Sequence, residues 1–581
     1  MTTMGPDIKP EPVDATELDS QSDELLFDPD VSTRKHFHDD PSACQGILKH
    51  AQTKFSLVIK ESLIQSAGSG LFVEDAICEG EEIFQNQPFI SCRAPHLKDV
   101  CDHCLMNRNA KLDAEQGGID CQHGAVPFAK CKGCKYAHYC SRTCQKKAWA
   151  AYHREECQVL KEIPDISPLV RILFRILLWD KAGKISSGYW NILMMLEDCF
   201  DQRDEESEDD SFQLAVDAVQ RNISHRNVTV IWKLFYAIQI NAMNIRMADD
   251  YTSTGMSFDL AISVINHSCD PNAFAFFEGN RLHVRSLKPI AAGDEITLPY
   301  CNTMVGVLSR REGLQKSHFL TCSCNRCIAE LKEHEQIARA SGSSVEKLYA
   351  AQKELGQMGD ALHKTVRDRP SEQGKKAVLE NFVAKLKGVM REGLPQGAWP
   401  DTLDPLPDLR LSLAMSYGEL HHLGASVMYA LKGCLLNKGR HVGPDWVHNF
   451  LDLVAILAEI GQLDLDDQLF KITGFPQRFE IQVTVAGYMV YLLAAMTKTY
   501  GTGSRFVRGY RRFIINFLDI PGLPAAADEN FVDVFKAMQA KLLCWAGVDE
   551  TKAIVMPDEQ TIKGLLEADM ARQLSALSIE D

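Results

Sequence analysis

The sequence predicts a multidomain α+β protein: a β-rich region that is interrupted by a cysteine-rich block and followed by a long helical region. Short apolar clusters with glycine turns, typical of strands, occur at residues 55–100 and return at 246–301. Closely spaced cysteines fill residues 101–157. From residue 331 to 581, apolar residues recur at three- and four-residue steps, which indicates helices.

The chain is long enough for several domains, and its charge is unevenly distributed. It has 581 residues, 45% of them hydrophobic, and a formal net charge of −16. Residues 1–43 hold 11 acidic and 3 basic residues, so this segment carries half of the net charge. An acidic segment with few aromatic residues is predicted to be a disordered tail. Within it, Lys9 in "IKPE" matches the pattern of a SUMO acceptor.

No N-terminal apolar run resembles a signal peptide, and we expect no membrane partner. The most apolar late segment, 481–496, contains Gln482 and falls short of the ~18–20 apolar residues that span a bilayer. It is predicted to be a buried helix. We therefore expect a monomeric intracellular protein, cytoplasmic and/or nuclear, whose 19 cysteines stay reduced.

Two further helical regions are expected. The periodic runs at 169–180 and 230–245 predict that residues 158–245 form helices, with the acidic run at 204–211 as a solvated loop between them. In the long C-terminal region, packed helix pairs are expected. Tetratricopeptide-like stacking and an irregular helical bundle both stay open, because no clear 34-residue period is present.

The cysteine-rich block, residues 101–157, predicts two zinc sites. Its candidate ligands are Cys101, Cys104, Cys131, Cys134, Cys140, Cys144, His153 and Cys157. Seven thiolates and one imidazole make two complete tetrahedral sets, which structural Zn²⁺ sites require. Cys144, Trp149, His153 and Cys157 follow one another at helical steps, so ligands and a packing tryptophan are expected to share a face.

Two other features of this block allow alternatives. Cys121 and His123 lie in the long gap after Cys104 and are alternative ligands, although we favour a loop insertion. Seven basic residues and no acid lie between Lys130 and Arg154. They are interpreted either as the solvated surface of a small domain or as a docking face for nucleic acid or an acidic peptide.

A second cluster, Cys322, Cys324 and Cys327, offers three thiolates and lacks a fourth ligand nearby. The next downstream cysteine is Cys434. Upstream, Cys301 and Cys269 are candidates, and Cys269 lies in "INHSCDPN" (265–272), after the strand-like "FDLAISV" (258–264). The residues alone leave the fourth ligand open.

Four motifs occur in the order found in SET-domain lysine methyltransferases: "SAGSGLF" (66–72), "INHSCDPN" (265–272), "AAGDEITLPY" (291–300) and "FLTCSCNRC" (319–327). The block at 101–157 resembles the MYND zinc finger, so the chain resembles the SMYD (SET and MYND) family over about residues 55–330. The resemblance implies a SET fold split by the insertion. Its parts are the N-terminal part at 55–100, the MYND finger at 101–157, a helical insert at 158–245, the core at 246–301, a post-SET zinc segment at 302–330 and a helical domain at 331–581.

The resemblance also implies how the ligands pair. In the family, Cys101 and Cys104 pair with Cys140 and Cys144 on one zinc. Cys131 and Cys134 pair with His153 and Cys157 on a second zinc. A third zinc takes the three post-SET cysteines together with Cys269.

The resemblance implies an S-adenosylmethionine-dependent protein-lysine N-methyltransferase, acting on a histone or non-histone protein that presents a lysine. Methyl transfer needs a neutral amine aligned with the breaking bond, so alignment is the main task. Tyr300 is the expected catalytic residue, orienting the amine, because a phenol with a pKa near ~10 is a poor base. The expected cofactor-binding residues are Gly68, Ser69, Gly70, Asn241, Asn266, His267, Tyr300, Phe319 and Leu320.

Two positions depart from the family pattern. Ala67 stands where a basic residue often precedes the first glycine, and Leu320 stands where an aromatic residue is usual. An alternative function is therefore a catalytically weak adaptor that recruits partners through its zinc finger. A sequence-specific DNA-binding protein is disfavoured, because the spacing lacks the Cys2His2 order of a ββα finger.

Overall fold

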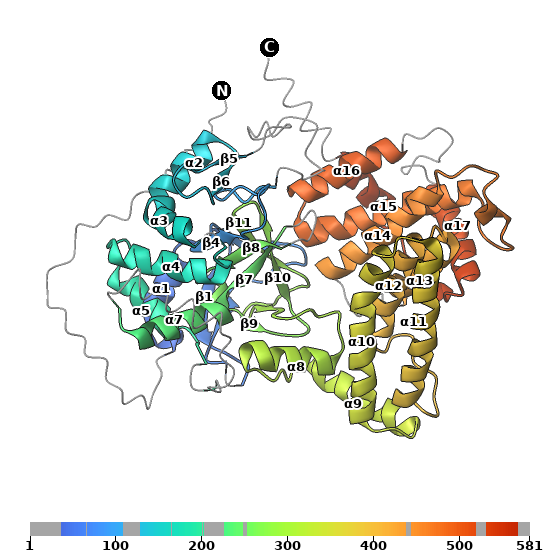
Figure 1. Cartoon of the computed structure of the whole chain (residues 1–581), viewed down its shortest axis with the longest axis horizontal. Coiled ribbons are helices and arrows are strands. Elements are labelled where there is room, and N and C mark those ends of the chain that lie inside the picture. The colour runs from blue at the N-terminus through green and yellow to red at the C-terminus, as the bar shows by residue number, and fades with distance from the viewer. Residues whose placement is uncertain are drawn as a thin grey trace, which may run out of the picture.

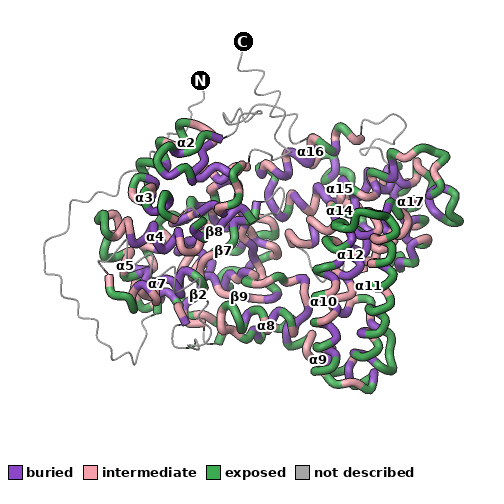
Figure 2. Tube along the Cα trace, in the orientation of Figure 1, coloured by how far each residue is buried: buried purple, intermediate pink, exposed green. Residues whose placement is uncertain are grey.

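The computed structural model describes residues 36–65, 67–107, 128–163, 165–199, 202, 226–247, 253–436, 443–518 and 530–567. The predictions for Lys9, Cys121, His123 and the acidic run at 204–211 lie outside these residues. In Figure 1 the strands and helices α1 to α7 form one half of the molecule, and helices α9 to α17 form the other. Figure 2 shows buried residues along the strands and along the inner helices of both halves.

The first half contains several small sheets. One three-stranded sheet has the order β10-β11-β3, another has the order β4-β8-β7, and β9 pairs in parallel with β12. Hairpins β1-β2 and β5-β6 complete the set. The strands are β1 (Leu57–Glu61), β2 (Ser69–Val73), β3 (Glu82–Asn86), β4 (Ile90–Arg93), β5 (Ala129–Lys130), β6 (His138–Tyr139), β7 (Met243–Arg246), β8 (Ser253–Phe258), β9 (Asn266–His267), β10 (Ala273–Glu278), β11 (Arg281–Ser286) and β12 (Thr297–Leu298).

The predicted disordered tail extends too far, because its last residues are ordered. A 3-10 turn at Phe37–Asp39 leads into α1 (Pro41–Leu48). Asp40 caps this helix, its side chain accepting the backbone N–H of Ala43 at 3.0 Å. Phe37 and Ile47 are buried in the core of the first half. Burial of these apolar side chains stabilises the ordered segment.

Helices cover the strands, as expected for residues 158–245. They are α4 (Pro168–Lys181), α5 (Ser187–Met195) and α7 (Val228–Asn241). The predicted helix at 230–245 is wrong at its end, because Met243–Arg246 is strand β7 paired with β8. Its burial alternates, with Ile245 buried between exposed neighbours, and this two-residue period suits a strand.

The strand expected at 258–264 is also corrected. Strand β8 ends at Phe258, and Ile262–Val264 is a 3-10 turn. The side chain of Asp259 accepts the backbone N–H groups of Ala261 and Ile262 at 3.0 and 3.1 Å. An aspartate that accepts from the next residues stabilises a turn over a strand, although the segment is apolar.

The cysteine-rich block consists of the β5-β6 hairpin and a long interrupted helix. Helix α2 (Arg142–Ala148) continues through a π-helical turn at Trp149–His153 into α3 (Arg154–Glu162). The expected packing role of Trp149 holds only in part. Its ring meets the His153 ring edge-on at 5.8 Å, yet the residue is 45% exposed.

From residue 325 onward, every regular element in the described residues is a helix or a 3-10 turn. The helices are α8 (Val307–His318), which precedes this region, then α9 (Asn325–Ala340), α10 (Val345–Arg367), α11 (Glu372–Gly393), α12 (Leu406–Gly418), α13 (Leu423–Leu435), α14 (Pro444–Ile460), α15 (Arg478–Tyr500), α16 (Arg505–Leu518), α17 (Phe531–Ala546) and α18 (Glu559–Glu567). Tetratricopeptide-like stacking stays a prediction.

Helix α15 is long and apolar enough to cross a membrane by length and composition, but 67% of its most apolar window is buried inside the fold. It lies in the core of the second half, where Val485, Tyr488 and Leu492 are fully buried. The predicted buried helix at 481–496 is confirmed.

Strand β10 joins the two halves. Its alternate residues point to opposite faces. Ala273 and Phe277 belong to the core of the first half, whereas Phe274 and Phe276 belong to the core of the helical half. The ring of Tyr500 packs edge-on against both of the latter, at 5.8 and 5.1 Å. The helical half therefore packs against one face of β10, a strand that leads to the candidate site.

Candidate functional site

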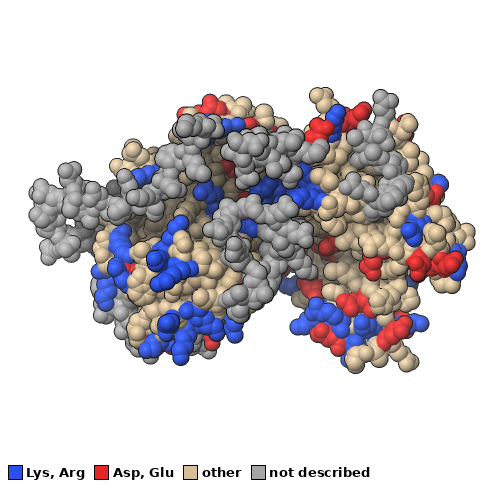
Figure 3. Space-filling view, turned by 90° about the horizontal axis from the view of Figure 1, so that it is seen from above, with Lys and Arg blue, Asp and Glu red and all other residues tan. Residues whose placement is uncertain are grey.

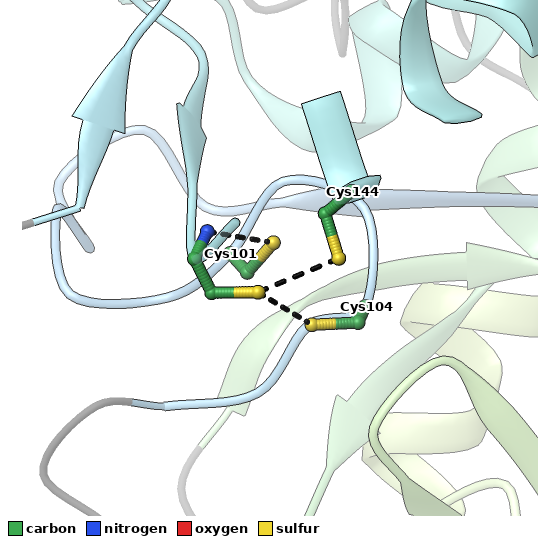
Figure 4. Close-up of side chains that lie close together, drawn as sticks. Cys101, Cys104 and Cys144 are labelled. Atoms are coloured by element: carbon green, nitrogen blue, oxygen red, sulfur yellow. Dashed lines mark hydrogen bonds between the residues drawn. The ribbon is translucent and has the colours of Figure 1, made fainter. Parts of the chain in front are cut away.

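The structure brings together the ligands of both predicted sets in the cysteine-rich block. One set is Cys101, Cys104, Cys140 and Cys144, and the other is Cys131, Cys134, His153 and Cys157; in each, all ligand atoms lie within 4.8 Å of one another. Figure 4 shows the side chains of Cys101, Cys104 and Cys144 converging.

The spacing of these atoms fits a zinc ion. Neighbouring sulfurs of a tetrahedral site with Zn–S bonds of ~2.3 Å lie ~3.8 Å apart. The Cys140 sulfur is 3.6 Å from that of Cys104 and 3.4 Å from that of Cys144. In the other set, the Cys131 and Cys157 sulfurs are 3.9 Å apart. Four sulfurs in one set, and three sulfurs with one imidazole nitrogen in the other, match the donor sets of structural zinc.

Buried ion pairs connect the cysteine-rich block to helix α4 in the rest of the first half. Arg171 of α4 donates two hydrogen bonds of 2.7 Å to the carboxylate of Asp102, which follows the ligand Cys101. The guanidinium of Arg175 lies 3.0 Å from the carboxylate of Glu156, which contacts His153 Nδ1 at 3.3 Å. All five side chains are at most 3% exposed. The arginines hold the pKa of Glu156 below its usual value, so the ion pairs persist.

This network also orients a metal ligand. His153 turns Nε2 toward the Cys134 sulfur at 3.6 Å while Nδ1 faces Glu156. A carboxylate on the far nitrogen fixes which nitrogen is available to an ion. Asp102 and Glu156 were not identified from the sequence, and the only signal was an acid directly beside a ligand in each case.

The third predicted set is also brought together. Cys269, Cys322, Cys324 and Cys327 lie within 4.8 Å of one another, and we call them the Cys269 set. The rival fourth ligand, Cys301, groups instead with His267 and Cys269. Cys269 and Cys327 are fully buried, so an ion shared by this set would lie inside the protein.

Arginines surround the Cys269 set and compensate thiolate charge. Arg310 Nη2 lies 3.7 Å from the Cys327 sulfur. Arg326 donates to the backbone carbonyls of Cys269 and Thr303, both at 2.8 Å, and so ties α9 to the motif at 265–272. Glu330 pairs with both guanidinium groups at 2.7 Å.

Asn266 lies at the centre of the predicted cofactor motifs. Its Nδ2 donates to the carbonyl of Ser69 at 2.9 Å and to the carboxylate of Glu295 at 2.8 Å. These bonds fix the amide so that its carbonyl oxygen is the atom left for a ligand. Gly70 is required here, because a Cβ would collide with Glu295.

Glu295 was missed as a site residue, although it lies within a quoted motif. Its carboxylate accepts from Ser62 Oγ at 2.8 Å and from the backbone N–H of Leu63 at 2.9 Å, as well as from Asn266. The residue is buried. A charge held by three donors is a fixed negative end beside the Gly68–Gly70 turn.

His267 contributes its ring to the fold. Its Nδ1 accepts the backbone N–H of Tyr300 at 3.0 Å, so Nε2 carries the proton and faces the Cys269 sulfur at 3.2 Å. Both ring nitrogens are therefore occupied by protein groups. The predicted contact of His267 with a cofactor can involve only its backbone.

Tyr300 connects these motifs to a cavity. Its hydroxyl donates to the carbonyl of Ile265 at 2.7 Å, and its ring lies 5.3 Å from that of His267. The ring is still 36% exposed. Burial of the hydroxyl raises its pKa, so the phenol stays protonated and keeps oxygen lone pairs for an incoming donor.

The cavity encloses about 490 Å³ between the two halves. Tyr300, Asn241 and Cys269 line it from the first half, and Trp446 and Tyr500 line it from the helical half. The Asn241 amide donates to the carbonyl of Ala237 at 2.8 Å, which holds it at the end of α7.

Most of the predicted cofactor residues lie away from this cavity. Among them only Asn241 and Tyr300 line it; Gly68, Ser69, Gly70, Asn266, His267, Phe319 and Leu320 do not. Leu320 packs into the cluster around Cys269 and Cys322. Phe319 has a left-handed backbone (φ 53°) at the end of α8. The prediction that either residue covers the adenine stays a prediction.

His318 was not predicted and covers part of Tyr300. The two rings stack with centroids 4.8 Å apart and planes at 30°. Nδ1 of His318 contacts Ser317 Oγ at 2.7 Å. Burial, with the nearby His267, lowers the pKa of His318 to about 4, so the ring is neutral. The residue directly precedes a quoted motif, which was the only available signal.

Comparison with known proteins agrees with this geometry. A family model described as the SET domain matches residues 68–301. The chain is 27% identical over 295 residues to "Histone-lysine N-methyltransferase SMYD3" of Mus musculus, covering 48% of this chain and 64% of that protein. It is 28% identical over 278 residues to "SET domain and MYND-type zinc finger protein 6" of Schizosaccharomyces pombe, covering 46% and 52%.

A third relative is "N-lysine methyltransferase SMYD2-B" of Danio rerio, 28% identical over 273 residues, with 45% of this chain and 58% of that protein covered. The chain spans less than two thirds of the length of these relatives. The matches and the site define a SET-domain protein. Within that class, the relatives include proteins named SMYD3 and SMYD2-B, and the similarity to them covers a little under half of this chain.

Proposed function

We propose that this protein is an S-adenosylmethionine-dependent protein-lysine N-methyltransferase with a histone or non-histone substrate. The position of Tyr300 carries the proposal. The residue borders the motif that holds Asn266 and His267, and it also opens onto the 490 Å³ cavity. A cofactor at the motif and a lysine in the cavity would then meet at one phenol. The names of the relatives, which include histone-lysine and N-lysine methyltransferases, support this reading.

When bound, the cofactor supplies an electrophilic methyl group. The residues of this chain supply position. Asn266 presents a fixed amide oxygen, and the missing side chains of Gly68 and Gly70 let His36 and Glu295 pack closely on the turn. The Tyr300 hydroxyl donates a hydrogen bond to the carbonyl of Ile265. Its oxygen is therefore oriented to accept a hydrogen bond from an amine and to align that amine. The raised pKa of Tyr300 makes it a positioning group for the amine and not a general base.

We propose that three structural zinc ions hold this arrangement, two in a MYND finger at 101–157 and one in the Cys269 set. Sulfur spacings near those of a tetrahedral site support the two ions of the block. The convergence of four sulfurs within 4.8 Å supports the third ion. We also propose that the exposed basic residues of the block, from Lys130 to Arg154, contact a peptide or nucleic acid. Figure 3 shows Lys and Arg side chains gathered on the half that holds the block. A monomer in the cytoplasm or nucleus, without a membrane partner, completes the proposal.

The test is methyl transfer from labelled S-adenosylmethionine to proteins of a cell extract. We expect the wild type to transfer label and Tyr300→Phe to lose at least about tenfold of the rate, the effect of ~1.4 kcal/mol on a barrier. Tyr417→Phe is the matched control, because this tyrosine stacks on Tyr429 in the helical half. Cofactor binding without transfer by the wild type would favour the adaptor.

A further inference from the structure

The ordered N-terminal segment, residues 36–48, is built into the first half. Phe37 is 7% exposed, and its carbonyl accepts from the Cys44 thiol at 3.0 Å. Helix α1 packs so closely on α5 that a Cβ on Gly46 would lie 2.9 Å from Ile192 Cδ1. A segment held by a buried aromatic residue and a packed helix is part of the permanent structure, unlike a lid.

This segment places two imidazoles on the Gly68–Gly70 turn. The backbone N–H of His38 donates to Ser69 Oγ at 3.2 Å, and the ring Nδ1 contacts the same oxygen at 3.0 Å. The His36 ring covers Gly68, since a Cβ there would lie 2.7 Å from its Nδ1. The two rings stack in parallel, 5.4 Å apart with planes at 6°. His36 is exposed, so the pair has an edge that a ligand can reach.

The Gly68–Gly70 turn therefore lies between groups that favour a cation on one side and groups that favour an anion on the other. On the Gly70 side, the carboxylate of Glu295 and the amide oxygen of Asn266 favour a cation. On the Gly68 side, imidazole N–H groups favour an anion, and the residue directly before the turn, residue 67, is alanine. Asp39 is the acid facing the pair, 3.7 Å from His38 Nε2. The amino-acid end of S-adenosylmethionine carries both an ammonium and a carboxylate, in a pattern that matches these two sides.

We propose that His36 and His38 form one wall of the cofactor site, in which His38 anchors the wall to Ser69 and the exposed imidazole of His36 binds the α-carboxylate of the cofactor. This inference rests on the proposed function and adds a binding contribution from outside the region matched by the SET domain, residues 68–301. It gives the segment before β1 a role in affinity, and it accounts for a turn that lacks a basic residue at position 67.

Titration calorimetry with two ligands tests the wall. S-adenosylmethionine has the carboxylate, and decarboxylated S-adenosylmethionine lacks it. We expect the full-length wild type to prefer the first ligand. In the double variant H36A/H38A, affinity for S-adenosylmethionine falls at least about tenfold, whereas affinity for the decarboxylated ligand changes less than about twofold.

His50→Ala is the matched control, because His50 follows α1 and contacts the hydroxyl of Tyr189 at 3.0 Å. Both affinities should stay at the wild-type level. If the double variant does not fold, the single variant His36→Asn keeps the His38 anchor and should show the same selective loss, several-fold in size. Unfolding temperature and zinc content report folding in each case.

Three results decide the matter. Equal loss for both ligands would reduce the histidines to structural anchors and overturn the proposal. Tighter binding by the double variant would make the segment an obstruction and would also overturn it. Failure of the wild type to bind either ligand would instead defeat the proposed function, and the wall with it.

Discussion

The cysteine-rich block and the Cys269 set use the same ligand chemistry in different surroundings. The two sets of the block lie beside buried ion pairs between Asp102, Glu156 and the arginines of α4. None of the described block residues lines the cavity. Within the Cys269 set, Cys269 itself lines the cavity, and His267 links the Cys269 sulfur to the backbone of Tyr300. Zinc chemistry can thus serve attachment in one region and site geometry in the other.

Removing all metal should erase the difference between the two regions. Apparent binding energies of ~10–16 kcal/mol per structural zinc match or exceed a net stability of ~5–15 kcal/mol. We expect a strong chelator to lower the unfolding temperature sharply and to abolish methyl transfer together with structure. Elemental analysis and circular dichroism follow both events. Full activity after complete zinc removal would show that the ions are not structural.

Cutting the attachment of the block should cost the next largest amount. Glu156→Ala leaves the buried guanidinium of Arg175 without its carboxylate, and breaking a buried pair costs about 3–5 kcal/mol. Chemical denaturation measures the loss. Glu155→Ala is the neighbouring control, since its partner Lys184 is on the surface and the pair is worth at most about 1 kcal/mol. If Glu156→Ala and Glu155→Ala lowered the stability equally, the buried ion pairs would contribute no more than a surface pair.

Opening the Cys269 set should change the site beside Tyr300 as well as lower the stability. Cys269→Ser is expected to lower the zinc content from about three ions to about two and to weaken cofactor binding, because the contact with His267 is lost. Mass spectrometry under native conditions counts the ions. Cys301→Ser should keep all three, because the four ligands of the set remain. If only the Cys301 variant lost zinc, Cys301 would be the fourth ligand and Cys269 would not.

The smallest expected effect is a pH dependence beside Tyr300. The folded pKa of His318 is about 4, below the value of 6.5 for a free histidine. Between these values the unfolded chain binds a proton that the folded chain does not, so this contribution to stability falls as pH falls from 6.5 toward 4. His318→Phe should remove it while keeping the stacked ring. Identical slopes of stability against pH, from 7 to 5, in both proteins would contradict the assignment.

The sequence predicted the parts of the site that rest on rigid spacing. Cys101 and Cys104 lie three residues apart, and such a short spacing lets two thiolates share an ion, so this part of each ligand set is visible in the sequence. Contacts between distant segments leave no such pattern. The approach of His38 to Ser69, and the hold of Glu295 on Asn266, depend on tertiary packing.

Local pattern also failed where turns compete with apolar periodicity. Residues 243–245 continue a helical run in the sequence, but pairing with β8 makes them part of a strand. In 258–264 the apolar residues indicate a strand, yet the Asp259 side chain stabilises a turn. In both cases a hydrogen bond to a neighbouring group determined the backbone conformation, and the composition of the segment did not indicate that bond.

The placement of Cys269 gives the protein an order of assembly. Cys322, Cys324 and Cys327 lie within six residues and can gather an ion before the strands pair. With the proposed ion bound, Cys269 would join it beside the paired β9 and β12, and residues 270–321 would form a loop closed by metal, with Tyr300 inside it. Closing a loop of this length is an entropic cost that the ion offsets. Completion of the fourth bond would thus mark the moment at which the newly made chain acquires a formed site.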